Sequence, residues 1–212
     1  TAWRARRNGS LMKWTPEPPG RRPTSEPAGI RLPDPNHRSD GDSLVRVTHV
    51  VSNFGLGGAE RHVLTLATAQ REAGVDATVL TVGDGYLARA CAERGVPVTT
   101  ELQLNPPRTD PRTPAENVAR ITEVLAGLAP DIVHAHLHRA GSKVVPAARE
   151  LGLPVAYTLH SAEFDHFLAA QFVVGNSFPV ISVFDGGARS VIRDAPRPDL
   201  VFHVPNGVHR PA

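Results

Sequence analysis

Residues 45–62, VRVTHVVSNFGLGGAERH, pass from a run of β-branched apolar residues through a glycine cluster into a helical pattern. The run over 45–51 predicts a buried strand, and the spacing of apolar residues from Ala59 onward predicts a helix. A glycine cluster between the two marks a place where the backbone turns tightly or comes close to a ligand. The stretch therefore predicts a strand, a short loop and a helix, which is the first unit of an α/β fold.

The same alternation of apolar runs and helical patterns continues along the chain. Strands are predicted at residues 45–51, 77–82, 96–100, 132–136, 155–160, 180–183 and 201–204, and helices at about 59–73, 86–94, 114–128, 140–151 and 187–193. No helix is predicted between residues 160 and 180. We therefore expect a Rossmann-like, doubly wound, mainly parallel sheet with helices on both faces. If the strand order is 3-2-1-4-5, ligands bind beyond the carboxyl ends of the first and fourth strands.

The composition divides the chain into three parts. Residues 1–43 hold seven of the 20 prolines, clustered arginines and few periodic apolar residues, which predicts a disordered Arg/Pro-rich tail. Residues 44–205 form the predicted Rossmann-like domain. The turn signal Asn206-Gly207 lies in residues 206–212, which are interpreted as the start of an interdomain linker.

Charge and hydropathy exclude several classes of function. No run approaches the ~18 apolar residues of a membrane span, and no apolar secretory signal begins the chain, so a cytoplasmic location is expected. The tail holds 8 of the 23 basic and 5 of the 21 acidic residues, which leaves 15 against 16 in the rest and no overall attraction for nucleic acid. Trp3, Trp14 and the arginines of the tail leave peripheral membrane contact open beside plain disorder. The single Cys91 cannot form an internal disulfide.

The glycine loop is a candidate binding place for an anion. Amide groups at the start of the helix after Gly57 and Gly58 favour a phosphate or a sugar close to the backbone. A nicotinamide site would need a third glycine, but Ala59 and Glu60 follow, and the next strand has no acid placed for a ribose. The dinucleotide interpretation is therefore set aside, and a simple strand-to-helix turn remains the alternative.

Histidines form the second candidate site. His134, His136 and His138 alternate along an extended segment, so three imidazoles share one face. With His160 as a fourth ligand, such an array keeps a metal-dependent hydrolase as an alternative. Because no Asp or Glu lies within the cluster to orient the ligands, no metal is predicted, and His138 is equally compatible with a packed or solvated role.

His160 ends the fifth predicted strand and lies at the same edge of the sheet. An imidazole there can bind sugar hydroxyls or transfer a proton near neutral pH. Glu163 follows on the loop as a further candidate.

Four segments together resemble the N-terminal domain of family 4 retaining glycosyltransferases of the GT-B architecture. They are residues 45–74, which begin with the opening stretch, and then APDIVHAHLHRAG, VAYTLHSAEF and HVPNGV; the resemblance covers roughly residues 45–208. The resemblance implies a two-domain enzyme in which the second domain holds a nucleotide-sugar and carries an E-x₇-E signature. Because the family continues past P-N-G into that domain, the chain is interpreted as a truncated frame or an isolated half.

The resemblance also implies roles for the candidate residues. Gly57 and Gly58 would lie against the donor diphosphate, and His160 would contact the transferred sugar as the catalytic residue. His134 and His136 would line the acceptor side, to which we also assign Glu163. Retention in the family is explained by front-face attack assisted by the donor phosphate, with no protein nucleophile, no bound metal and no tightly bound cofactor.

The sequence therefore predicts the acceptor-side half of a hexosyltransferase. The full enzyme would move a sugar from a nucleotide-sugar to a glycan or lipid-linked acceptor with retention, as in the synthesis of cell-envelope polysaccharides. The fragment alone is expected to be inactive, because charge on the leaving phosphate would lack part of its stabilisation. Two alternatives remain: a non-catalytic glycan- or phosphate-binding module, and the metal-dependent hydrolase.

Overall fold

The chain divides into two compact units, Thr1–Asp42 and Ser43–Ala212. A computed structural model describes residues 3–8, 11–16, 44–52, 55, 57–100 and 114–207. In the first unit, β1 (Trp3–Asn8) pairs antiparallel with β2 (Leu11–Pro16), a hairpin that the sequence analysis did not predict. The signal that could have indicated it is Gly9-Ser10 between the paired residues, a typical two-residue turn sequence. Residues 17–43 of the predicted tail lie outside the described residues.

The second unit is built on a seven-stranded sheet in which every pairing is parallel. Its spatial order is β5-β4-β3-β6-β7-β8-β9, so the chain moves outward from β3 in one direction and then returns to add strands on the other side. The strands are β3 (Arg46–Val51), β4 (Asp76–Leu80), β5 (Val98–Thr99), β6 (Ile132–His136), β7 (Val155–Leu159), β8 (Val180–Ser182) and β9 (Val201–His203). This order confirms the predicted doubly wound sheet and places the reversal of strand order between β3 and β6.

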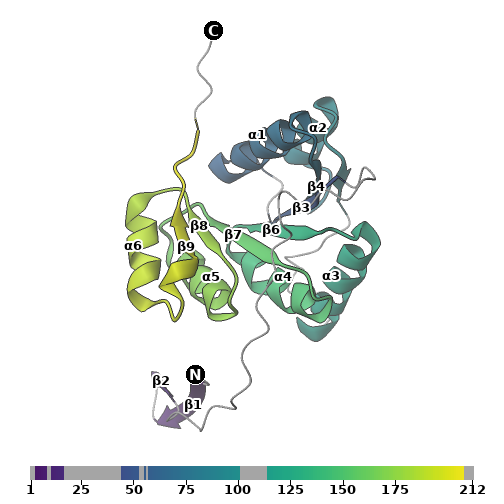
Figure 1. Ribbon diagram of the computed structural model, residues 1–212. Helices are drawn as coiled ribbons and strands as arrows, with labels where there is room; N and C mark the ends of the chain where they lie inside the picture. Colours follow the sequence, from purple (N-terminus) through teal and green to yellow (C-terminus); the bar gives the residue numbers. More distant parts are fainter. Residues whose placement is uncertain are drawn as a thin grey trace. The chain divides into compact units, whose positions relative to one another are not determined.

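Helices cover both faces of this sheet (Figure 1). The helix α1 packs against α2, β3 and β4, whereas α3 to α6 form a continuous layer in which each helix packs against the next or the strands beneath. The helices are α1 (Gly58–Glu72), α2 (Tyr86–Glu93), α3 (Pro114–Leu128), α4 (His138–Glu150), α5 (Phe164–Gly175) and α6 (Asp185–Asp194), followed by the short 3₁₀ turn Pro198–Leu200. Gly74, Gly95 and Gly152, which were predicted to end helices, all have the positive φ typical of helix ends.

Two apolar cores explain why the strands are almost continuously apolar. On one face Val51 and Val79 pack with Val63 and Leu64 of α1 and with α2. On the other face Val50 joins a larger cluster that includes residues of α3, α4, α5 and α6. Successive residues of β3 therefore point into different cores, as expected of a strand buried on both sides.

The segment between residues 160 and 180 contains α5, so the prediction of no helix there is wrong. One face of α5 is buried through His166, Ala169, Ala170, Val173 and Val174, at true helical spacing. Phe164, Leu168 and Phe172 are apolar as well but lie exposed on the remaining surface. Because apolar residues occupy both faces, the sequence shows little amphipathic periodicity and the helix was missed.

Candidate functional site

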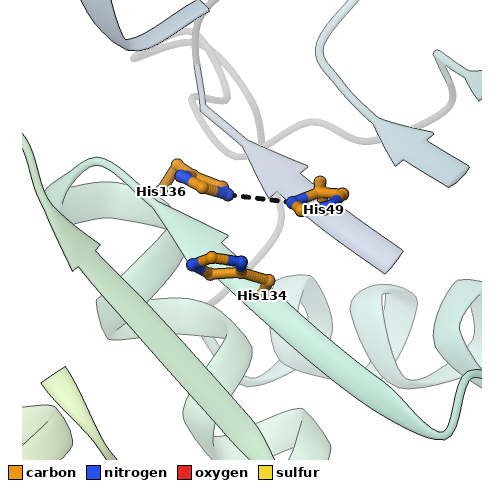
Figure 2. Close-up of side chains that lie close together, drawn as sticks. All are labelled: His49, His134 and His136. Atoms are coloured by element: carbon orange, nitrogen blue, oxygen red, sulfur yellow. Dashed lines mark hydrogen bonds between the residues drawn. The ribbon is translucent and has the colours of Figure 1, made fainter. Parts of the chain in front are cut away.

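Five histidines gather where the strand order reverses. His49 lies on β3, His134 and His136 lie on β6, and His160 follows the end of β7, while His62 extends from α1. The parallel register explains the meeting, because His49 is directly opposite His134 and Val51 is opposite His136. His49, His134 and His136 consequently form one group on a single face of the sheet (Figure 2).

The rings of this group are in close contact. Ring centroids are 4.2 Å apart between His134 and His136, 5.1 Å between His49 and His134, and 5.3 Å between His136 and His160. His49 and His136 are fully buried, and His134 is 8% exposed, whereas His160 is half-buried. Of these four residues His160 is therefore the best placed to contact a ligand, and the predicted acceptor-side residues His134 and His136 lie in the interior.

Hydrogen bonds link Gln70 and three of the histidines in series. Nε2 of His49 lies 2.6 Å from Oε1 of Gln70 on α1, and Nδ1 of His49 lies 3.1 Å from Nε2 of His136. Nδ1 of His136 in turn lies 3.0 Å from Nε2 of His160. The series starts on α1, crosses β3 and β6, and ends at the loop after β7, so it connects four separate elements of the fold.

His134 is held by a bond outside this series. Its Nε2 lies 2.7 Å from the hydroxyl oxygen of Thr158 on β7, and Thr158 is almost fully buried. The buried polar side chains of the two strands thus satisfy one another, which is what allows them to occupy an otherwise apolar layer.

His62 connects the histidines to the turn that ends the described chain. Its ring meets that of His160 edge-on, with centroids 5.0 Å apart. Burial lowers the pKa of His62, and a side-chain hydrogen bond with Asn206 opposes that change. The P-N-G turn, predicted from the sequence as a boundary, therefore lies against the histidine group.

Burial makes the group uncharged near neutral pH. Desolvation is the largest cause that lowers the pKa of His49 to about 4 and that of His160 to about 3. The pKa values of His134 and His136 are also lowered well below 6.5, first by burial and then by the neighbouring imidazoles. Neutral imidazoles can both donate and accept hydrogen bonds, which the linked series requires.

These shifts predict a loss of stability in mild acid. The unfolded chain binds protons at its histidines near pH 6.5, whereas folded His49 and His160 do so only near 4 and 3. The unfolded state therefore holds more protons between these values, so stability is greatest above about pH 6.5 and falls as the pH drops toward 4. We expect the denaturant midpoint of the chain to fall progressively over that range.

The matched variants are His49→Gln and His203→Gln, the latter at an exposed position on β9. His49→Gln is expected to show a shallower dependence of the denaturant midpoint on pH, and His203→Gln the same dependence as the original chain. Equal slopes for all three proteins would contradict the assignment of acid sensitivity to the buried histidines.

Metal binding was the main alternative for these residues. Nitrogens of His49, His134 and His136 lie within 4.8 Å of one another, so the three rings could supply ligands. However, the facing nitrogens of His49 and His136 are already joined at hydrogen-bond distance, and no Asp or Glu belongs to this group. The hydrogen-bonded series accounts for the arrangement of the rings. That this group binds no metal remains a prediction.

The glycine loop lies at the start of α1. The amide of Gly57 donates a 2.8 Å hydrogen bond to Oε2 of Glu60, whose side chain is buried. Oε1 of Glu60 is buried too and has no hydrogen-bond partner among the described residues. Gly58 is exposed, and among the described residues nothing beyond its own neighbours and helix backbone lies within 4 Å of the position that its Cβ would take. Of the two predicted phosphate-binding glycines, Gly58 is thus the one with room for a ligand, and residues 53, 54 and 56 lie outside the described residues.

His138 does not join the histidine group. The strand ends at His136, and Leu137 takes a φ of 68°, which turns the chain before α4 begins at His138. His138 instead lies 3.2 Å from Nε2 of His166 on α5. Of the two roles that the sequence left open for His138, the structure shows the packed one and not convergence with His134 and His136.

Glu163 lies at the N-cap of α5, and its side chain is exposed. One carboxylate oxygen is 3.9 Å from Nε2 of His166. The structure places it three residues after His160, so its predicted contact with an acceptor stays a proposal.

The sequence analysis missed His49, His62 and Gln70. A signal existed for His49, since a histidine inside a strand expected to be buried on both faces needs a hydrogen-bonding partner. Nothing in the sequence identifies that partner, because the bond to His136 depends on the pairing of strands 87 residues apart.

Residues 56–210 match the sequence profile of Glycosyltransferase Family 4. No curated protein matches the chain. Among solved structures, HepE of Anabaena, determined with UDP and glucose, is 20% identical with a TM-score of 0.62, and the match covers 77% of this chain and 45% of HepE. A glycosyltransferase from Rickettsia africae is 16% identical with a TM-score of 0.61, covering 79% of this chain and 44% of that one.

The UDP-GlcNAc 2-epimerase of Methanocaldococcus jannaschii is also similar, at 13% identity and a TM-score of 0.56, with 74% of this chain and 45% of that one covered. The chain thus spans less than half the length of these structures. Because a transferase and an epimerase share the fold, the fold alone does not distinguish the reaction. The family profile matches well over half of the sequence, so the chain belongs to Glycosyltransferase Family 4.

Proposed function

We propose that this chain is the N-terminal, acceptor-side domain of a two-domain enzyme that transfers a hexose from a nucleotide-sugar to a hydroxyl group. The observation that carries the proposal is the position of His160, half-buried at the carboxyl end of β7 and joined to the buried His136. Membership of the family and the match to slightly less than half of HepE support the same assignment.

The donor side of the site is the start of α1. A diphosphate near Gly58 would meet the positive end of the helix dipole, and Gly58 leaves space for it. HepE was solved with UDP and glucose, which supports a UDP-sugar as the donor of this enzyme too. The chemistry needs no cofactor beyond this substrate.

The variant Gly58→Leu tests the donor side. Because the described residues leave the Cβ position open, they accommodate the larger side chain, while a ligand close to the backbone would be displaced. We expect the KM for the donor in the two-domain enzyme to rise by about tenfold, equivalent to roughly 1.4 kcal/mol of lost binding. Steady-state kinetics with UDP-glucose would measure it.

The matched control is Gly127→Leu on α3, where the Cβ position is also unobstructed. It should leave the donor KM unchanged. If Gly58→Leu binds the donor as well as the original enzyme does, the diphosphate does not lie at this loop.

On the acceptor side we propose that His160 contacts the transferred sugar and that Glu163 binds the acceptor. His134 and His136 act from behind His160, since they are buried. For a retaining reaction, the acceptor oxygen would bond to the anomeric carbon on the face from which the diphosphate leaves. The hydroxyl proton would pass to the leaving phosphate oxygen, so no protein nucleophile is needed.

The acceptor is proposed to be a glycan or a lipid-linked sugar. Phe164, Leu168 and Phe172 form an exposed apolar row on α5, which begins directly after Glu163, and this row supports an acceptor with an apolar part. Among the helices in the described part of the chain, none is both long and apolar enough to cross a bilayer. Action at the cytoplasmic face of a membrane is therefore proposed as a peripheral contact.

A further inference from the structure

We propose that Gln70, His49 and His136 are positioning residues that fix the tautomer of His160, so that its Nδ1 presents a lone pair to a substrate hydroxyl. The role of His160 toward substrate rests on the proposed function. The hydrogen-bonded chain behind it is a property of the protein alone and is tested separately.

The direction of the chain follows from its first member. Oε1 of Gln70 can only accept, so the proton on His49 must be on Nε2, 2.6 Å away. A neutral imidazole carries a single N–H, which leaves Nδ1 of His49 as an acceptor. The 3.1 Å contact with His136 is then a bond donated by Nε2 of His136.

The position of the proton on His136 fixes in turn that on His160, at the edge of the sheet. Since Nε2 of His136 holds its proton, Nδ1 of His136 must accept, and the donor 3.0 Å away is Nε2 of His160. His160 therefore keeps its own proton facing inward. Its Nδ1 is left as an acceptor, suited to a hydroxyl that donates and unsuited to a carbonyl or phosphate oxygen.

Burial makes this direction hard to reverse. His49 and His136 are fully buried, so a ring nitrogen left without a partner would be costly. Neither residue has such a nitrogen among the described residues. Reversing one proton would require every proton in the chain and the Gln70 amide to turn together, and linked bonds of this kind strengthen one another in a medium of low dielectric constant.

The chain also connects the two proposed halves of the site. Gln70 lies near the end of α1, and Gly58, where the donor diphosphate is proposed to bind, is the first residue of the same helix. The orientation of His160 is thus anchored to the element that carries the donor side.

The first experiment uses the 212-residue chain labelled with ¹⁵N at its histidines. Long-range ¹H–¹⁵N spectra near neutral pH should show Nε2 protonated and Nδ1 unprotonated in His49, His136 and His160. Scalar ¹⁵N–¹⁵N couplings should appear across two N–H···N hydrogen bonds, the one from His136 to His49 and the one from His160 to His136. Missing couplings, a protonated Nδ1 in His160, or stoichiometric zinc bound to His49 and His136 would overturn the proposal.

The second experiment compares Gln70→Leu with Gln70→Glu and Gln171→Leu. Gln171 on α5 also donates a part-buried hydrogen bond, to the carbonyl of Val191, and has no link to His160. Gln70→Leu should move the Nδ1 resonance of His160 toward that of a tautomer mixture and, in the two-domain enzyme, lower kcat about tenfold, the effect of one hydrogen bond worth roughly 1.4 kcal/mol.

Gln70→Glu keeps an accepting oxygen and should restore both readouts, while Gln171→Leu should change neither. Equal kcat losses in Gln70→Leu and Gln171→Leu would overturn the positioning role. If the couplings are present but the two-domain enzyme transfers no sugar, the proposed function fails, and the role of His160 toward a substrate hydroxyl falls with it.

Discussion

Replacing His160 with alanine in the two-domain enzyme is expected to lower kcat by about a hundredfold or more, the scale of losing one preorganised hydrogen bond in the transition state. Of the three histidines in the linked series, His160 is the one that is not fully buried, and it is the one proposed to touch the sugar. Contacts that form mainly in the transition state affect kcat more than KM. Initial rates over a range of donor concentrations separate the two.

The fold should survive this substitution, because His160 lies in a loop after β7 and is half-buried. A thermal unfolding curve should confirm that, and His203→Ala on the exposed end of β9 serves as the control with unchanged kcat. A His160→Ala enzyme with normal turnover would remove the central residue of the proposed site.

Gly141→Ala is expected to give the largest loss of stability. An added Cβ would lie 2.7 Å from Cε2 and 2.9 Å from Cδ2 of Tyr157, whose ring is fully buried. Because both distances are too short for carbon atoms, either the buried ring or α4 would have to shift. We expect the free energy of unfolding to fall by about 2 kcal/mol, typical of an overpacked core, even though alanine is the better helix former.

The matched control is Gly127→Ala, an exposed position on α3 where an added Cβ meets nothing. There the gain in helix propensity should raise stability by up to about 1 kcal/mol. Urea unfolding of both variants measures the difference. Stabilisation of both to a similar extent would show that α4 does not depend on the close approach to Tyr157.

Local sequence signals were sufficient for most of the fold. The bounds of β6 and α3 agree with those predicted, because a short run of apolar residues and Pro114 at a helix start are strong signals. The helix α5 was missed because Phe164 and Leu168 place apolar side chains on its exposed face. The apolar residues of α5 therefore lie on both its buried and its exposed face, and the sequence does not distinguish the two.

The candidate site was less accessible to sequence analysis. Position at the end of a strand was enough to place His160 at the edge where the other histidines gather, but the surroundings of His136 come from β3, α1 and the loop after β7. For His138 the sequence left convergence and a packed role equally open, and the positive φ at Leu137, which ends the alternation, could not be read from it. Gln70 and His49 meet only through the packing of α1 on β3, which no spacing within the sequence encodes.

The most direct test of the account is release of the nucleoside diphosphate from a nucleotide-sugar by the two-domain enzyme. Incubation with UDP-glucose, UDP-N-acetylglucosamine and GDP-mannose, followed by ³¹P and ¹H NMR, detects slow hydrolysis even without an acceptor. We predict release from at least one donor, with the anomeric configuration of the sugar retained in the first product and with the rate lost in His160→Ala. Binding of these donors without any release would contradict the account and identify a non-catalytic binding module instead.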